Sequence, residues 1–256
     1  LEAGDYALTG NMPMSEVVTQ LRHGRLQAKT VTIREGLRAE EVAYLLASEG
    51  LAGQEEFIGL VRGDAFQYDF LRDRPATAPH SLEGFLFPDT YQFAVTASAT
   101  QIIDAMLQNF DRRVTIEMRQ QALDEGLNLY QALTLASIVE REAVLAEERP
   151  IIASVYLNRL RKGIYLESDP TVQYGKGYDA ATGRWWPHIS MGELRTVDSP
   201  YNTYIHPGLP PGPICSPGLA SIQAVLQPAK TNYLFFLAKG DGSHVFAETF
   251  EEHLQN

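Results

Sequence analysis

The sequence predicts an α+β protein of two units, and three features of its pattern carry that prediction. Up to about residue 62, strand-like and helix-like stretches alternate: residues 30–33 alternate with period two, and residues 39–48 repeat apolar side chains at helical spacing. Two long apolar helical patterns follow at residues 131–145 and 150–161. Near the end, residues 233–246 read as a strand with a hairpin-like return. We therefore expect a small βα unit followed by a mainly helical domain with a small antiparallel sheet.

A short proline-flanked linker at residues 76–79 marks the predicted division of the chain. Residues 1–75 form the first unit in this interpretation, beginning with a strand at residues 6–8, and residues 76–256 form the second. Within the second unit, residues 102–110 and 113–123 are predicted helices joined by a polar turn at Asp111. The stretch 166–175, with Asp169 before Pro170, is predicted to be a polar turn that runs into a short strand.

Composition and charge exclude several classes of function. Apolar residues make up 45% and charged residues 21% of the chain, which favours a globular protein over a disordered one. The net charge of -11 would repel a phosphate backbone, so we expect no nucleic-acid partner. The lone cysteine, Cys215, excludes an intrachain disulfide. The six histidines form no metal-ligand spacing, and no phosphate-binding or dinucleotide motif is present, so we expect no metal and no cofactor.

The beginning of the chain suggests a missing segment. It starts with Leu1 rather than Met, and its first residues read like the middle of a domain. No apolar run reaches the ~18 to 20 residues needed to cross a bilayer. We therefore expect a soluble fragment of a protein that carries a further segment upstream.

Glu142 is the strongest candidate for a catalytic side chain. The helix predicted at residues 131–145 is apolar over much of its circumference, and helical spacing stacks Glu142 against Ile138, Val139 and Leu145. A carboxyl group on an apolar face loses solvation, and the negative end of the helix dipole is close, so both effects raise its pKa toward the range of a general acid. The simpler alternative is an ion pair between Glu142 and a neighbouring arginine at the helix end.

A proline-rich segment, residues 199–218, is the strongest candidate for a binding loop. It holds six of the fourteen prolines, which exclude a helix and favour an ordered surface loop. Tyr201, Asn202 and Tyr204 provide ring faces, hydroxyl groups and an amide, which suit a sugar with its apolar faces and hydroxyl rims. Trp185 and Trp186 lie in another predicted loop and are candidates either for stacking on a sugar or for a small hydrophobic cluster. The alternative for residues 199–218 is a purely structural loop.

Four motifs, in order along the chain, resemble one enzyme family. They are LEGFLFPDTY (82–91), ASIVERE (136–142), SDPTVQYG (168–175) and YNTYIHPGLPPGPI (201–214), and GSHVF (242–246) with His253 matches at the C-terminal end. Together they resemble the endolytic murein transglycosylase, or YceG-like, family over essentially the whole chain. The stretch VTIREGLRAEEVAYLLASEGL (31–51) also resembles LysM-like modules, which hold N-acetylglucosamine polymers.

The resemblance implies a LysM-like module ahead of a lysozyme-like catalytic domain. It also implies non-hydrolytic cleavage of the β-1,4 bond between N-acetylmuramic acid and N-acetylglucosamine in nascent peptidoglycan, which leaves 1,6-anhydro ends and terminates strand elongation. The family's catalytic glutamate, the second one of its S-I-V-E-R-E pattern, is Glu142 here. The resemblance further implies a single-pass anchor in the bacterial inner membrane and an extracytoplasmic catalytic part. It also implies contact with peptidoglycan polymerases (penicillin-binding proteins).

The remaining site residues follow by weaker inference. We expect Tyr201, Asn202 and Tyr204 to orient the acetamido groups of the sugar, and four more polar residues to line or brace the cleft: Glu83, Asp89, Ser168 and Asp169. Glu140 is the alternative acid. Two other functions stay open: a lysozyme-like hydrolase that uses Asp89 or Asp169 as its second carboxylate, and a glycan-binding protein of the cell envelope without catalytic activity.

Overall fold

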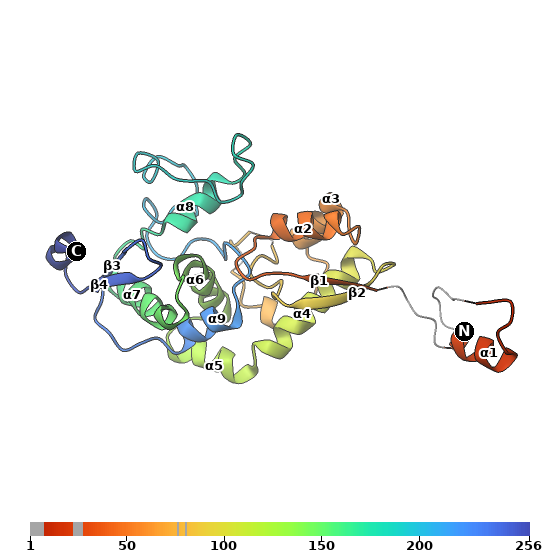
Figure 1. Cartoon of the computed structure of the whole chain (residues 1–256). Helices are drawn as coiled ribbons and strands as arrows, with labels where there is room; N and C mark the ends of the chain where they lie inside the picture. The colour runs from red at the N-terminus through yellow and green to blue at the C-terminus, as the bar shows by residue number, and fades with distance from the viewer. Residues whose placement is uncertain (1–7, 23–27, 76, 80) are drawn as a thin grey trace.

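Helices make up most of the regular secondary structure, and two small antiparallel sheets join segments of the chain (Figure 1). The computed structural model describes residues 8–22, 28–75, 77–79 and 81–256. The elements in chain order are α1 (Met14–Arg22), β1 (Ala28–Thr32), α2 (Ala39–Ser48), α3 (Gln54–Val61), η1 (Asp69–Leu71), β2 (Thr90–Ala94), α4 (Ala99–Arg113), α5 (Ile116–Asp124), α6 (Leu129–Glu142), η2 (Ala146–Glu148), α7 (Arg149–Lys162), α8 (Asp169–Lys176), α9 (Leu219–Leu226), β3 (Phe235–Ala238), β4 (His244–Ala247) and α10 (Phe250–Gln255). This arrangement confirms the predicted α+β class. The strand expected at residues 6–8 lies mostly outside the described residues.

The first unit is built around the β1–β2 ribbon. These strands pair antiparallel, with Val31 opposite Tyr91, and helix α2 packs against α3, which in turn packs against α4. Val42, Leu46 and Phe57 are fully buried between these elements because their helices turn one apolar stripe inward. In Figure 1, α2 and α3 lie above the ribbon, and α4 crosses behind it.

The predicted division between residues 75 and 76 falls inside this unit. Strand β1 precedes that position and β2 follows it, so a single sheet crosses it. An aromatic cluster also crosses it: the ring centroids of Phe70 and Phe110 are 4.9 Å apart, and those of Phe85 and Phe110 are 5.1 Å apart. The first unit therefore continues through β2, because its core needs side chains from both sides of the linker.

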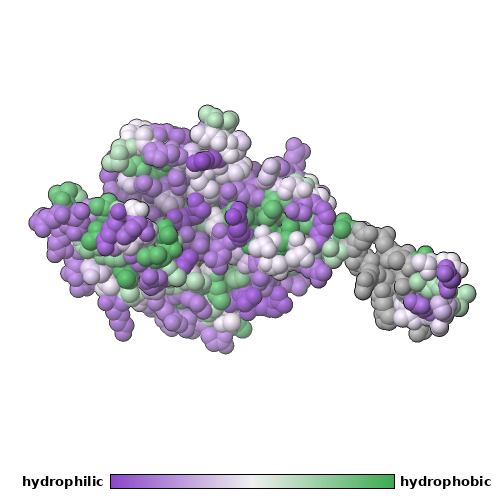
Figure 2. All heavy atoms as spheres, viewed as in Figure 1, coloured by the Kyte–Doolittle hydropathy of each residue, from purple (hydrophilic) through white to green (hydrophobic). Residues whose placement is uncertain are grey.

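Helix α6 is the centre of the second unit. All residues from Ala132 to Val139 are buried, and α6 packs against α5, α7, α8 and α9 (Figure 1). The β3–β4 hairpin closes the end of the unit beside α7, and α10 packs on that hairpin. Most of the face shown in Figure 2 is hydrophilic, with apolar residues in separate patches. No helix of the described ranges combines the length and apolar character that a membrane span needs.

Two predicted local structures are wrong. Helix α4 runs through Asp111 to Arg113, and the break comes one turn later because the Thr115 side chain caps α5 by accepting a hydrogen bond from the Met118 amide. Residues 169–176 form helix α8 rather than a turn and strand. Pro170 lies in the first turn of α8, where its missing N–H costs nothing, so the Asp169–Pro170 pair starts a helix.

Glu83 joins the two units from a buried position. Glu83 is only 4% exposed. Both oxygens of its carboxyl group accept hydrogen bonds from the Ala39 amide at the start of α2, at 3.1 and 3.2 Å. The Tyr174 hydroxyl of α8 approaches the same carboxyl group at 3.4 Å. Burial, reinforced by the nearby charge of Glu40, raises the pKa of Glu83 to about 8. A protonated carboxyl group therefore connects α2 with the second unit at neutral pH.

Replacing Glu83 by glutamine tests this junction. The unfolded glutamate ionises near 4.5, whereas the folded protein keeps the proton up to a pKa of about 8. The stabilisation from the protonated group is thus complete below pH 4.5 and is lost as the pH rises through 8. Because glutamine cannot ionise, Glu83→Gln should gain on the order of 3 kcal/mol of unfolding free energy relative to wild type between about pH 5 and about pH 9.

Urea unfolding followed by circular dichroism at the two pH values measures this gain. Glu55→Gln, at an exposed glutamate of α3, is the matched control. The same difference between Glu83→Gln and wild type at both pH values would contradict a protonated Glu83.

Candidate active site

Glu142 is the last residue of helix α6. The sequence pattern predicts a helix through residue 145, but Ala143 is extended with ψ of 120°, and η2 follows before α7. The carboxyl group therefore sits where the unpaired carbonyl groups of the helix end concentrate negative potential. This position disfavours the ionised form of Glu142.

Two hydroxyl groups bind the same oxygen of Glu142. The Tyr156 hydroxyl donates to Oε1 at 2.6 Å, and the Ser168 hydroxyl donates to Oε1 at 2.7 Å. Tyr156 lies on α7 and is buried, and Ser168 is buried immediately before α8. Within the described part of the chain, Oε2 has no hydrogen-bond partner and is left for a ligand or a proton.

Burial dominates the titration of Glu142. Loss of solvation raises its pKa, the hydrogen bonds from Tyr156 and Ser168 lower it by stabilising the carboxylate, and the charge of Asp169 raises it again. The net direction is upward. The residue is only half-buried, so the group has lost much of its water and still opens to the surface. A carboxyl group in this state suits a proton donor.

Glu140 has a different environment, although it lies on the same helix. Its Oε2 accepts hydrogen bonds from the Gly218 amide at 3.0 Å and the Ser221 hydroxyl at 2.7 Å, and Arg149 lies 3.8 Å from Oε1. Its side chain is 8% exposed. Glu140 therefore fastens α6 to the start of α9, and its acceptor atoms are already occupied.

The Glu142 site also includes the start of α8 and part of the proline-rich loop. Tyr204 donates its hydroxyl to Asp169 Oδ1 at 2.6 Å, and the charge of Asp169 reaches Glu142. The Thr203 hydroxyl accepts a hydrogen bond from the Ser168 amide at 3.0 Å. Three of the predicted site residues, Ser168, Asp169 and Tyr204, thus gather around Glu142.

Asn202 and Tyr201 support the loop from inside. Asn202 is fully buried: its amide donates to the carbonyl groups of Leu194 and Val197, and its oxygen accepts the Tyr204 amide. No atom of Asn202 is exposed to a ligand, so its expected contact with substrate is wrong for this conformation. The ring of Tyr201 packs 4.6 Å from that of Tyr174 and lies toward Glu83 rather than Glu142.

Glu83 and Asp89 also lie away from the Glu142 group. Glu83 is buried at the start of α2, as described above. Asp89 accepts hydrogen bonds from Arg113 at 2.9 Å and Asn109 at 3.0 Å, both on α4. The hydrogen bond from Asn109 leads the effects that lower the pKa of Asp89. Both residues brace the fold, and neither contacts Glu142.

The sequence analysis missed two neighbours of Glu142. Tyr156 was overlooked because it lies within the apolar pattern of α7, where a tyrosine reads as core. His244 belongs to the recognised GSHVF motif, and its Nδ1 lies 2.6 Å from Glu148 Oε2, while its amide donates to Glu148 Oε1 at 2.9 Å. Its charge acts on Glu142. Among the described residues, no group of three or more His, Cys, Asp and Glu side chains is placed to hold a metal ion.

Comparisons with known sequences give one family. The model of the YceG-like family matches residues 1–256. A protein of Bacillus subtilis (strain 168) named endolytic murein transglycosylase is 35% identical over 263 residues, covering 98% of this chain and 71% of that protein. A protein of the same name from Streptococcus pneumoniae (strain R6) is 30% identical over 283 residues; the match covers 100% of this chain but 50% of that protein.

A solved structure of the same family has a similar fold. The crystal structure of a YceG-like protein from Listeria monocytogenes superimposes with a TM-score of 0.76 at 33% identity, covering 100% of this chain and 84% of that chain. Family model, sequence relatives and structure thus coincide over the full length. The chain belongs to the YceG-like family.

Proposed function

We propose that this chain is an endolytic murein transglycosylase in which Glu142 is both the acid and the base. The observation that carries the proposal is the asymmetric hydrogen bonding of the Glu142 carboxyl group: Oε1 accepts two hydroxyl groups, while Oε2 has no partner among the described residues. An oxygen that accepts two hydrogen bonds is a poor place for a proton, so the proton belongs on Oε2. That oxygen is also the one left to meet the glycosidic bond.

The proposed reaction consumes no water. Glu142 Oε2 protonates the glycosidic oxygen as the bond to C1 of N-acetylmuramic acid breaks, and the 2-acetamido group of the substrate stabilises the cation at C1. The Glu142 carboxylate then removes the proton of the muramoyl 6-hydroxyl, whose oxygen bonds to C1. A 1,6-anhydro end and a free 4-hydroxyl result, and Glu142 regains its proton. A raised pKa suits both steps, because the group must give and recover a proton near neutral pH.

The neighbouring carboxylates favour a single acid over a hydrolytic pair. A glycosidase that uses two carboxylates needs the second one free as nucleophile or base. Asp169 accepts the Tyr204 hydroxyl, and Asp89 is held by Arg113 and Asn109. Glu148 is bound by His244. A lysozyme-like hydrolase remains the alternative, and it would use Asp169.

The finer assignments belong to the same proposal. Asp169 and Tyr204 are the substrate-facing residues that we favour. Ser168 is buried and orients Glu142, and Asn202 supports the loop from the interior. We propose a LysM-like character for the first unit and a lysozyme-like one for the second. The names of the relatives support murein as substrate and the cell envelope as location. An anchor in the inner membrane and contact with penicillin-binding proteins remain expectations from the family resemblance.

The products of Glu142→Gln and Glu140→Gln test the choice of acid. Glutamine keeps the shape of the side chain and can still accept the two hydroxyl groups, but it supplies no proton. Glu142→Gln should therefore lower cleavage of uncrosslinked nascent peptidoglycan by roughly 10²–10⁴-fold. Glu140→Gln should retain cleavage, since its role is to hold α9.

Mass spectrometry of the soluble fragments measures both the rate and the chemistry. We expect anhydro-ended fragments, one water lighter than hydrolysis products, from wild type and from Glu140→Gln. Hydrated fragments from wild type would indicate a hydrolase, and full activity of Glu142→Gln would reject Glu142 as the acid.

The pH profile of Tyr156→Phe tests how the acid is tuned. Removing this hydroxyl takes away a hydrogen bond that favours the carboxylate, so the pKa of Glu142 should rise further. The protonated acid then persists to higher pH, and the alkaline limb of the kcat profile should move upward in pH. We expect kcat at the optimum to fall about tenfold, because the carboxyl group loses one of its two orienting bonds.

Ser168→Ala should also move the alkaline limb of the kcat profile to higher pH. Tyr165→Phe, which removes the hydroxyl of a 40% exposed tyrosine, is the matched control and should leave the profile unchanged. An alkaline limb of Tyr156→Phe that coincides with that of wild type would show that this hydrogen bond does not tune the acid.

A further inference from the structure

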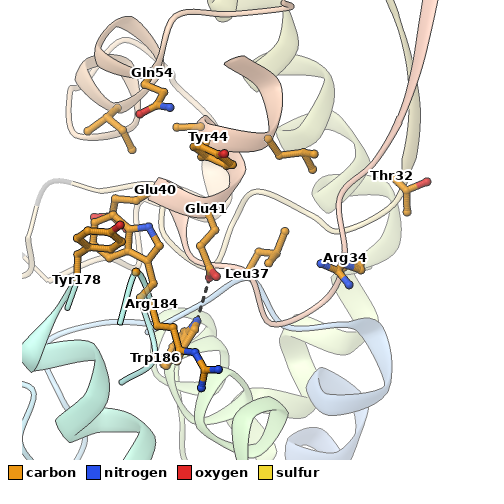
Figure 3. Close-up of a pocket in the computed structure, with 15 residues that line it drawn as sticks. Thr32, Arg34, Leu37, Glu40, Glu41, Tyr44, Gln54, Tyr178, Arg184 and Trp186 are labelled. Carbon is orange, nitrogen blue, oxygen red and sulfur yellow. Dashed lines mark hydrogen bonds between the residues drawn. The ribbon is translucent and has the colours of Figure 1, made fainter. Parts of the chain in front are cut away.

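A pocket separates the first unit from the loop that follows α8. Its volume is about 970 Å³, and it is lined on one side by residues of β1, α2 and α3 and on the other by residues 178–186 (Figure 3). Glu142 is not among the lining residues. The pocket is thus a second concave site, and the mechanism proposed above does not use it.

The acidic side chains of this pocket are already paired. Glu40 binds Arg38 at 2.8 Å and Arg62 at 2.9 Å. Glu41 accepts the indole N–H of Trp186 at 2.9 Å, which is the dashed line in Figure 3, and the Arg38 amide at 3.2 Å. These carboxylates are therefore occupied by the protein and are poorly placed to bind a cation.

The basic side chains of the pocket are unpaired. Arg34 and Arg184 both line it and are exposed, and neither guanidinium group makes an ion pair or hydrogen bond with any described residue. The chain as a whole carries a net charge of -11, whereas the pocket lining holds two arginines and two glutamates and is therefore less negative than the chain. Guanidinium groups bind carboxylates with two parallel hydrogen bonds, which makes a carboxylate the fitting partner.

Aromatic rings complete the lining. Tyr44 is 64% exposed and Tyr178 is 52% exposed, and both border the pocket. The Trp185 ring lies 5.0 Å from that of Tyr178. Exposed ring faces of this kind suit the apolar face of a sugar, while hydroxyl and amide groups at their edges meet its polar rim. The pocket thus offers both stacking surfaces and cations.

The pocket lies next to the helix that holds Glu142. The Arg141 guanidinium lies 3.9 Å from the centre of the Trp186 ring and also contacts the Gly36 carbonyl at 3.5 Å. Trp186 lines the pocket, and Arg141 directly precedes Glu142. The pocket therefore adjoins the end of α6 at Arg141, one residue before Glu142.

We propose that this pocket binds a muramoyl residue together with its peptide stem. Arg34 and Arg184 pair with the stem carboxylates, and the rings of Tyr44 and Tyr178 contact the sugar. The inference rests on the function proposed above and deepens it: the enzyme selects strands that still carry peptide stems. A glycan stripped of its peptides offers the same sugar rings, but it carries only the lactyl carboxylate close to each muramoyl ring and lacks the carboxylates of the stem.

The two tryptophans of the chain report directly on this site. Both Trp185 and Trp186 line the pocket, and the chain contains 2 Trp, so intrinsic fluorescence observes the pocket without any label. The Glu142→Gln protein, which cannot consume its ligand, is titrated with two probes: a tetrasaccharide of alternating N-acetylglucosamine and N-acetylmuramic acid with peptide stems, and the same glycan after an amidase has removed the stems.

We expect the stem-bearing probe to change the tryptophan fluorescence and to bind about tenfold more tightly than the stripped one. Adding Arg34→Gln and Arg184→Gln should reduce the affinity for the stem-bearing probe to that for the stripped probe and leave the latter unchanged. Tyr44→Ala should weaken the binding of both probes to the same extent. Arg72→Gln, at an arginine that directly follows η1 and whose side chain is 82% exposed, is the matched charge control and should keep the preference. Higher salt should reduce the preference.

Equal affinity of the two probes, or a preference that survives the double arginine variant, would overturn the stem-binding role. A separate cleavage assay of wild type distinguishes this failure from failure of the proposed function. If wild type produces anhydro ends equally fast from both glycans, the function stands and the pocket proposal falls. If wild type produces none while Glu142→Gln binds the stem-bearing probe through the arginines, the pocket stands and the transglycosylase assignment falls.

Discussion

The two hydrogen bonds that converge on Glu142 Oε1 constrain the geometry of the whole second unit. Their donors, Tyr156 and Ser168, come from α7 and from the start of α8, while the acceptor ends α6. Both bonds exist only if the three helices keep a fixed spacing. A buried carboxyl group without these donors would lack orientation, and one with donors on both oxygens would have no free atom for substrate. The arrangement thus makes one oxygen the anchor and the other the reactive atom.

Several buried polar contacts maintain that spacing. Arg159, on α7, donates to the carbonyl groups of Tyr165, Leu166 and Leu234, which fixes the chain just before Ser168 and the strand beside Tyr156. Glu167 adopts a left-handed backbone with φ of 51°, which is costly for a residue with a side chain, and its ion pair with Arg195 at 2.6 Å helps to hold it. This costly backbone conformation lies directly beside Ser168, whose hydroxyl group orients Glu142.

Sequence periodicity predicts local features of this protein better than it predicts distant contacts. The apolar helix and the place of Glu142 on it follow from helical spacing, although the helix ends at Glu142 and the pattern runs to residue 145. The motifs of residues 168–175 and 201–214 direct attention to Ser168, Asp169 and Tyr204. The pairing of β1 with β2 joins residues 58 apart, such as Thr32 and Thr90, and no local pattern encodes it, which explains the misplaced unit boundary. Asn202 looks like a ligand because an amide in a loop is polar, yet its partners are backbone carbonyl groups that only the folded loop provides.

The pocket beside Trp186 is joined to the end of α6 by Arg141, which contacts the Trp186 ring and directly precedes Glu142. The proposed reaction requires a Glu142 that holds its proton in the folded protein. Isotope-edited NMR of the glutamate carboxyl carbons, with Glu142→Gln to assign the signal, measures this titration directly. We predict a pKa for Glu142 clearly above its ordinary value of 4.5. The same pKa should describe the alkaline limb of the pH profile of kcat/KM. A Glu142 signal that titrates at or below 4.5 would contradict the account, because the carboxyl group would then have no proton to give at neutral pH.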